Sequence, residues 1–257
     1  MNTQTFNAKV ATPTTRLVGA MAITSMAWVV LGGLFVTPKD VEQGDAVRIM
    51  YVHVPTAWVA YLAFIVTAVA SACWLLSRKH SMGFDRVAGA SAEVGVLFMA
   101  MTLLSGSLWG RITWGAFWAW DPRLTTTAFL LVTYIGYLAV RGLGGSLEQR
   151  ARRSAVIALL AVLEIPLVHF SVLLWRSLHQ EASVLSGDGD IKMDGSMLTT
   201  LLVGVIGFTM TFAWLVLHRQ RVLAMRDAMQ MTQLDAALRE RANESADKNA
   251  IESSRLK

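Results

Sequence analysis

The chain contains 257 residues, of which 54% are hydrophobic and only 16% are charged. Soluble domains average about 25% charged residues, and the apolar residues here lie in long runs, so the composition excludes a single soluble domain and favours a membrane protein with several spans. The only cysteine, Cys73, excludes an internal disulfide, and the absence of a C-x-x-C-H motif excludes a c-type cytochrome.

A helix crosses a bilayer core of about 30 Å with roughly 20 apolar residues. Six segments meet this requirement, and the sequence therefore predicts an all-α polytopic membrane protein with six transmembrane helices. The predicted spans are Leu17 to Val36, Trp58 to Leu76, Val87 to Trp109, Leu124 to Val140, Ala155 to Trp175 and Met197 to Leu217.

The first span is expected to be a retained anchor, because its apolar core is too long for a secretion signal and ends without a small-x-small cleavage pattern. Of the 23 lysines and arginines, 17 fall on the side of the membrane that carries both termini. Basic loops face the cytoplasm, so both termini are predicted to be cytoplasmic. The net charge of +5 then reflects orientation, and no nucleic-acid partner is expected.

The chain divides into a cytoplasmic segment at 1–16, a transmembrane domain at 17–217 and a cytoplasmic tail at 218–257. In the tail, Val222, Met225, Met229 and Leu234 fall near one helical face, which favours a helical continuation of the last span. This face is either a docking surface for a partner or a solvated extension. Fraying is expected beyond Glu240.

Two histidines fall on the outer side of the predicted topology. His53 precedes the second span and His179 follows the fifth, so they lie in different outer loops. A lone histidine is usually a polar surface residue, but two imidazoles on opposite sides of an iron commonly hold haem in a six-coordinate state. The pair therefore makes haem binding possible without requiring it.

Three other ionisable residues lie inside predicted spans. His169 is about 15 Å of helical rise from His179, so the two histidines are not expected to ligate one metal from the same side. We expect His169 to make a polar contact within the bundle. Glu93 and Glu164 are expected to be structural, either packed in the neutral form or hydrogen-bonded to neighbouring helices, rather than to form a proton path.

The second outer loop is rich in tryptophan. Trp109, Trp114, Trp118 and Trp120 are four of the nine tryptophans and fall within twelve residues. An aromatic belt at the headgroups explains one or two indoles but not this density. If the segment is helical, Trp114, Phe117 and Trp118 share one face and present an apolar surface suited to a flat aromatic ligand.

The polar residues and glycines of this loop leave alternatives open. Gly110 and Gly115 would permit close backbone approach. Asp121 is expected to cap the fourth span, with Pro122 at its first position. Arg111 and Arg123 either pair with carboxylates such as haem propionates or anchor the loop at the headgroups.

Three motifs in this order resemble those of the CcmC family, haem-handling membrane proteins of cytochrome c maturation. They are Val52-His53-Val54-Pro55-x-Ala57-Trp58, Trp114-Gly115-x-x-Trp118-x-Trp120-Asp121 and Trp175-x-x-Leu178-His179-Gln180. The resemblance covers roughly residues 15 to 218. Phe117 and Leu174 depart from the pattern, since many members carry tryptophan at these positions.

The resemblance implies that His53 and His179 are the axial ligands of a transiently and non-covalently bound haem b. It also implies a site facing the periplasm from the bacterial inner membrane, and hand-over to a CcmE-like periplasmic haem chaperone. The implied partners are a CcmA-like ABC-type ATPase, its CcmB-like membrane subunit and a CcmD-like single-span protein. The haem-binding residues expected on this basis are His53, His179, Trp109, Trp114, Gly115, Phe117, Trp118, Trp120, Asp121 and Arg123.

Other function classes fit the sequence less well. The chain has no P-loop motif, so it is not expected to be an enzyme and could export haem only as the membrane subunit of an ABC-type transporter. A b-type electron carrier would normally place its ligands within facing spans, where His169 is the only histidine. A hydrolase is the weakest reading, because Ser171 and Ser177 lack a nucleophile-elbow context.

Overall fold

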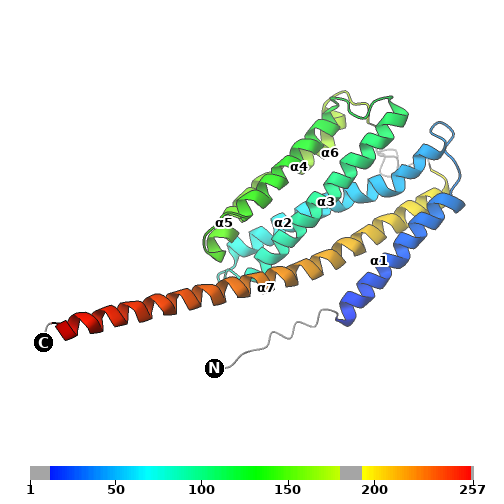
Figure 1. Ribbon diagram of the computed structural model, residues 1–257. Coiled ribbons are helices and arrows are strands. Elements are labelled where there is room, and N and C mark those ends of the chain that lie inside the picture. The colour runs from blue at the N-terminus through cyan, green and yellow to red at the C-terminus, as the bar shows by residue number, and fades with distance from the viewer. Residues whose placement is uncertain (1–11, 180–192, 256–257) are drawn as a thin grey trace.

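A computed structural model describes residues 12–179 and 193–255, and all regular elements within those ranges are helices (Figure 1). Six helical stretches are long and apolar enough to cross a membrane, which confirms the predicted all-α polytopic fold. Gln180 of the second histidine motif lies outside the described residues, as does most of the segment 1–16. The elements are α1 (Pro13–Leu31), the π-helix η1 (Gly32–Val36), the 3-10 helix η2 (Asp45–Ile49), α2 (Met50–Leu76), α3 (Met82–Thr113), α4 (Pro122–Arg141), α5 (Leu147–Ala161), α6 (Glu164–Leu174) and α7 (Gly195–Arg255).

The second span begins earlier than predicted, which changes the setting of His53. α2 starts at Met50 rather than Trp58, so His53 lies on its first turn and not in an outer loop. Pro55 lies inside α2, in its second turn, where the missing N–H removes one hydrogen bond of the helix. Gly204 of α7 leaves room at this point, since a Cβ on it would lie 3.3 Å from Pro55 Cγ.

The fifth span is not one continuous helix. It divides into α5 and α6 between Ala161 and Glu164, where Leu163 and Ile165 make short-range backbone bonds. Pro166 supplies the physical reason, because it has no N–H to donate to the carbonyl one turn earlier. The break redirects the chain just before it reaches His169.

The intramembrane ionisable residues differ in their surroundings. Glu93 accepts hydrogen bonds from Arg219, and Glu164 accepts one of 2.9 Å from Thr133, so both are bonded to neighbouring helices, one of the two structural settings expected. The expectation for His169 is wrong. Its side chain is exposed and its ring packs edge-on against Phe170, because the turn of α6 directs Val168 rather than His169 into the core.

Helix α7 continues far beyond the membrane-spanning part. It is helical to Arg255, so the helical continuation is confirmed and the expected fraying beyond Glu240 is wrong (Figure 1). Met229 and Leu234 are exposed on it. The tail is rich in alanine, glutamate, arginine and other good helix formers, which favours this continuation.

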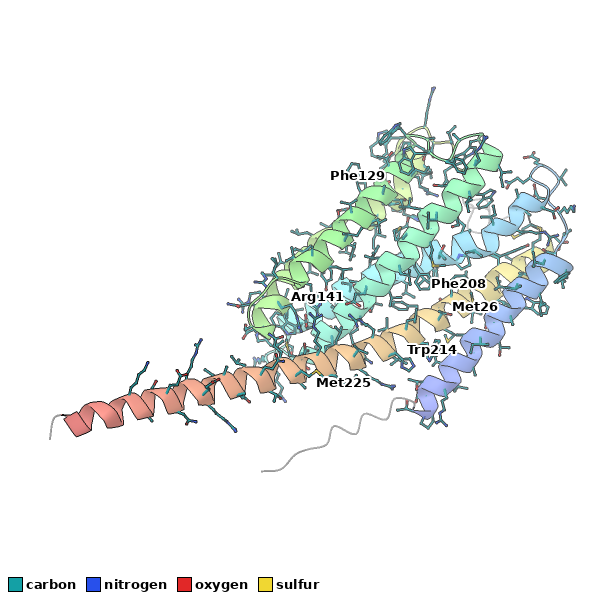
Figure 2. The ribbon with its side chains drawn as sticks, in the orientation of Figure 1. Met26, Phe129, Arg141, Phe208, Trp214 and Met225 are labelled. Atoms are coloured by element: carbon teal, nitrogen blue, oxygen red, sulfur yellow. The ribbon has the colours of Figure 1, made fainter. Side chains whose placement is uncertain are left out.

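Helices α2 and α3 form the most extensive pair at the centre of the bundle, with α1 and α7 side by side on one flank and α4 to α6 on the other (Figure 1). Small residues permit the close approaches, as expected in membranes. A Cβ on Gly95 would lie 2.6 Å from Phe64 Cε1, and one on Gly207 would lie 2.6 Å from Ser25 Cβ. Figure 2 shows Met26 and Phe208 where α1 and α7 meet the core.

A buried ionic cluster joins four helices at the end of the bundle nearest the α7 tail. Arg141 donates to both Asp85 oxygens at 2.6 and 2.7 Å. Arg150 bridges Asp85 at 2.7 Å and Asp227 at 2.9 Å. Since Asp85 and Arg141 are almost fully buried, their charges must be compensated by each other and by the rest of the cluster.

Candidate functional site

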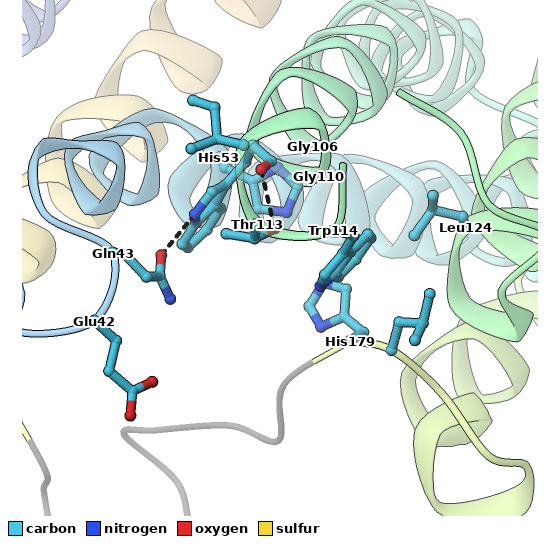
Figure 3. A pocket seen from close by; sticks show the side chains of 12 residues that line it. Glu42, Gln43, His53, Gly106, Gly110, Thr113, Trp114, Leu124 and His179 are labelled. Carbon is cyan, nitrogen blue, oxygen red and sulfur yellow. Dashed lines mark hydrogen bonds between the residues drawn. The ribbon is translucent and has the colours of Figure 1, made fainter. Parts of the chain in front are cut away.

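His53 and His179 come together at the end of the bundle opposite the α7 tail. Their ring centroids are 6.4 Å apart and their planes differ by 33°. Both rings line one cavity of about 430 Å³, a volume within the usual range for small-molecule sites. Its walls are formed by Glu42, Gln43, His53, Gly106, Trp109, Gly110, Ile112, Thr113, Trp114, Leu124, Leu178 and His179 (Figure 3).

One wall comes from residues that sequence reasoning missed. Gln43 accepts a hydrogen bond of 2.8 Å from Trp109 Nε1, which fastens the loop between η1 and η2 to the end of α3. Asp40 holds this loop closed, because its carboxylate accepts from the backbone N–H of Glu42 and Gln43. The spacing of Asp40 and Gln43 is a turn signal, but only the fold places that turn beside Trp109.

The opposite wall contains His179 and Trp114. The Trp114 indole lies beside the His179 ring, with centroids 6.3 Å apart in an edge-to-face arrangement (Figure 3). Trp114 in turn rests on Gly110, where a Cβ would lie 3.0 Å from the indole. Gly110 therefore permits the close approach expected of it.

Asp121 fixes the segment that carries His179. As predicted, it is the N-cap of α4, where its side chain accepts from the backbone N–H of Arg123 and Leu124. Its other oxygen accepts from the Ser177 hydroxyl and the Leu178 N–H, both at 2.7 Å. Burial by itself raises the pKa of this carboxyl, but these bonds outweigh burial and lower it. Asp121 thus orients the His179 segment and does not line the cavity.

The tryptophan-rich segment is not helical beyond Thr113, so the predicted common face of Trp114, Phe117 and Trp118 does not form. Gly115, at φ +80°, ends the helix in the left-handed conformation that favours glycine. Trp118 and Trp120 contact each other edge-to-face at 5.8 Å. Of the predicted platform residues, Trp109 and Trp114 line the cavity, whereas Gly115, Phe117, Trp118 and Trp120 lie outside its lining.

The two arginines of this region have different settings. Arg111 donates to the Gly115 carbonyl at 2.5 Å and its guanidinium lies 5.7 Å from the Phe117 ring centroid. Arg123 points toward α6, where it donates to the His169 carbonyl at 2.8 Å and lies 3.4 Å from His179 Nδ1. Arg123 is therefore the cation beside the histidine pair, although it does not itself line the cavity.

The donor set decides which metal species suits the cavity. Within residues 12–179 and 193–255, no group of three or more His, Cys, Asp or Glu side chains could hold a metal ion. Two imidazoles alone make an incomplete protein metal site, but haem brings four nitrogen ligands and needs only axial partners. The 6.4 Å between the two ring centroids is compatible with one metal held between them. Such a distance is the sum of two metal–nitrogen bonds of about 2 Å each and of the two distances from a ring nitrogen to its own centroid.

The chain is similar to proteins of one known family. The family model of CcmC, described as heme exporter protein C, matches residues 1–235. Heme exporter protein C of Bradyrhizobium diazoefficiens is 39% identical over 79% of this chain and 76% of its own length. That of Haemophilus influenzae is 33% identical over 77% and 79%. A putative cytochrome c biosynthesis ccmC-like mitochondrial protein of Arabidopsis thaliana is 36% identical over 75% and 71%.

Proposed function

The chain belongs to the heme exporter protein C (CcmC) family and has a haem-handling role in cytochrome c maturation, and from this we propose that it binds haem b between His53 and His179 and presents it to a periplasmic haem chaperone. Haem is cargo here, held without covalent attachment. The observation that carries the proposal is the convergence of two imidazoles, from α2 and from the segment after α6, at 6.4 Å in one cavity.

The surroundings of the pair support holding followed by release. Trp109 and Trp114 offer flat apolar surface, which stabilises a porphyrin through burial and offset stacking. Arg123 supplies a positive charge beside His179 for a propionate. Trp120 is 84% exposed at the same end of the bundle, so a partner protein could contact indole surface next to the cargo.

The orientation and partners follow from the same proposal. The cavity would face the periplasm and both termini the cytoplasm, in agreement with the excess of basic residues on the side of the α7 tail. The domain 17–217 would hold haem in the inner membrane, while the tail 218–257, which is helical as far as Arg255, would lie on the cytoplasmic side. A CcmA-like ATPase, a CcmB-like membrane subunit and a CcmD-like protein would assemble with it, because this chain carries no ATPase motif.

Movement of haem through the chain is the alternative, which the relatives' name, heme exporter protein C, suggests. Below the cavity, however, α2 and α3 are packed by Val59, Phe64, Phe98 and Met99, each no more than 3% exposed. Moving a porphyrin through this region would require the central helix pair to separate. The structure therefore favours binding at one face.

The proposal is tested by titrating hemin into the detergent-purified full-length protein. The wild type is expected to give a six-coordinate low-spin spectrum, and His53→Ala and His179→Ala should each lose it. His218→Ala is the matched control, because that ring contacts Trp214 at the other end of the bundle. A wild-type spectrum in either single variant would overturn the assignment of that histidine as a ligand.

Presentation is tested separately from binding. Haem-loaded protein is mixed with the purified apo chaperone, and the Soret band is followed after the two are separated by affinity capture. Haem should leave this chain in the presence of the chaperone and stay bound when an unrelated periplasmic protein is added. Retention in both cases would refute hand-over while leaving the binding site intact.

A further inference from the structure

One face of α3 packs directly against the His53 ring. Thr102, Ser105, Gly106 and Trp109 follow the i, i+3, i+4, i+7 spacing that places residues on one side of a helix. His53 Nδ1 lies 3.1 Å from the Thr102 backbone carbonyl oxygen and 3.1 Å from Ser105 Oγ. Trp109 contacts the ring edge-on, with centroids 5.7 Å apart.

These contacts determine where the proton of a neutral His53 lies. A carbonyl oxygen can only accept, so the nitrogen facing Thr102 must be the one that carries hydrogen. The Ser105 hydroxyl donates to the Met101 carbonyl at 2.8 Å, which leaves its oxygen lone pairs to accept from the same N–H. The remaining nitrogen, Nε2, then carries a lone pair, as a metal ligand must.

Gly106 determines where the ring lies. A Cβ at this position would be 2.9 Å from His53 Cε1 and 3.4 Å from Nδ1, closer than side chains approach in practice. Any larger residue would push the imidazole off the α3 surface and lengthen its bond to Thr102. The glycine is thus required by the position of the histidine.

We propose that this α3 face, Thr102, Ser105 and Gly106, holds His53 as the Nδ1–H tautomer before cargo arrives, so that Nε2 is pre-set as an axial ligand. Ser105 and Gly106 act through His53 and are positioning residues. The inference rests on the proposed function, since it concerns the state of one of its two ligands. Groups that accept from the second ring N–H commonly fix both the tautomer and the orientation of a ligating histidine.

The setting of His179 is different. Its Nδ1 faces Arg123 Nη1 at 3.4 Å, and a guanidinium only donates. The contact with Arg123 therefore does not place a proton on His179 Nδ1, as the Thr102 carbonyl does on His53 Nδ1. The two histidines therefore differ in their surroundings, and it is His53 that the α3 face holds as a pre-set ligand.

The test uses full-length protein in detergent with hemin as the probe. Ser105→Ala removes one acceptor, and Gly106→Ala displaces the ring. Both variants should bind hemin about tenfold more weakly or worse, the usual consequence of losing such a partner. The haem midpoint potential should also rise, because a weaker acceptor at Nδ1–H makes the imidazole a poorer donor to ferric iron. Ser105→Thr keeps the hydroxyl, so its hemin affinity and its haem midpoint potential should both match those of the wild type.

Matched controls lie on α3 and on the neighbouring α4. Ser107→Ala changes the same residue type on the opposite face of α3, and Gly136→Ala adds a Cβ where no heavy atom lies within 4 Å. Both should leave the hemin affinity and the potential unchanged. Circular dichroism and gel-filtration profiles of all variants establish that they fold.

The outcomes separate this inference from the function on which it rests. If His53→Ala loses the low-spin spectrum but folded Ser105→Ala and Gly106→Ala match the wild type in affinity and potential, the positioning role is refuted and haem binding stands. If His53→Ala itself binds hemin as the wild type does, the proposed function fails as well. A potential that moves in Ser105→Ala and returns in Ser105→Thr supports the role.

Discussion

Asp121 Oδ2 accepts a hydrogen bond of 2.7 Å from the Ser177 hydroxyl, joining residues 56 positions apart. The bond connects the first residue before α4 to the segment that ends in His179. Ser177 also accepts from the His179 backbone N–H at 3.0 Å. Hydrogen bonds therefore run without a break from Asp121 through Ser177 to the backbone of His179. A carboxylate that the sequence identifies as a helix cap therefore also determines where the second histidine lies.

Asp121→Asn is expected to weaken hemin binding while preserving most of the fold. Asparagine caps helices nearly as well as aspartate, so α4 should still begin at Pro122. Its side chain has a single oxygen, which cannot cap α4 and also accept from Ser177 and Leu178, so the His179 segment should loosen. We expect about tenfold weaker binding of hemin, measured by titration. Ser177→Ala should show part of the same loss, and equal affinity in all three proteins would contradict the positioning role of Asp121.

The low pKa of Asp121 makes its contribution to stability depend on pH. Because the folded pKa lies below the ordinary value of about 3.9, the stabilisation is complete above that value and is lost as pH falls through the folded pKa. The difference in unfolding midpoint between wild type and Asp121→Asn should therefore be constant above about pH 5 and should shrink below about pH 4. Each of these pH limits holds to within about one pH unit. Tryptophan fluorescence during denaturation in mixed detergent measures it. A difference that grows on acidification would contradict the assignment.

Asp85→Asn should destabilise the bundle by about 3–5 kcal/mol, because it leaves the Arg141 guanidinium buried with its countercharge removed. Equilibrium unfolding in mixed detergent measures the loss. The matched control is Glu148→Gln, which breaks an exposed pair with Arg152 and should cost less than about 1 kcal/mol. Equal effects of the two substitutions would show that burial of the cluster contributes nothing.

Gly207→Val tests the packing of α1 on α7. Its Cβ would lie 2.6 Å from Ser25 Cβ, so the two helices must separate, at a cost of about 1–3 kcal/mol. Gly136→Val on α4 makes the same change in open space. Comparing the two variants therefore removes the effect of the different helix propensities of glycine and valine. The thermal unfolding temperature should fall only for Gly207→Val. A similar fall in both variants would point to propensity rather than contact.

The number and kind of the membrane helices could be predicted from the sequence because each span must satisfy its own backbone hydrogen bonds and present about 20 apolar residues to lipid. These requirements are local, so composition and run length reveal them. The cap at Asp121 followed from local chemistry in the same way. Prediction was wrong at the start of α2 and in the fifth span, which divides into α5 and α6, because run length and composition do not fix where a helix begins or breaks.

The sequence alone identified His53 and His179 as a pair and the tryptophan-rich segment as unusual. It did not reveal that Gln43 closes one wall, that Asp121 holds the His179 segment, or that Thr102, Ser105 and Gly106 face His53. These relationships join helices and loops separated by tens of positions, and no local propensity encodes them. They depend on helix crossing and rotation, which only the packing of all spans against one another decides.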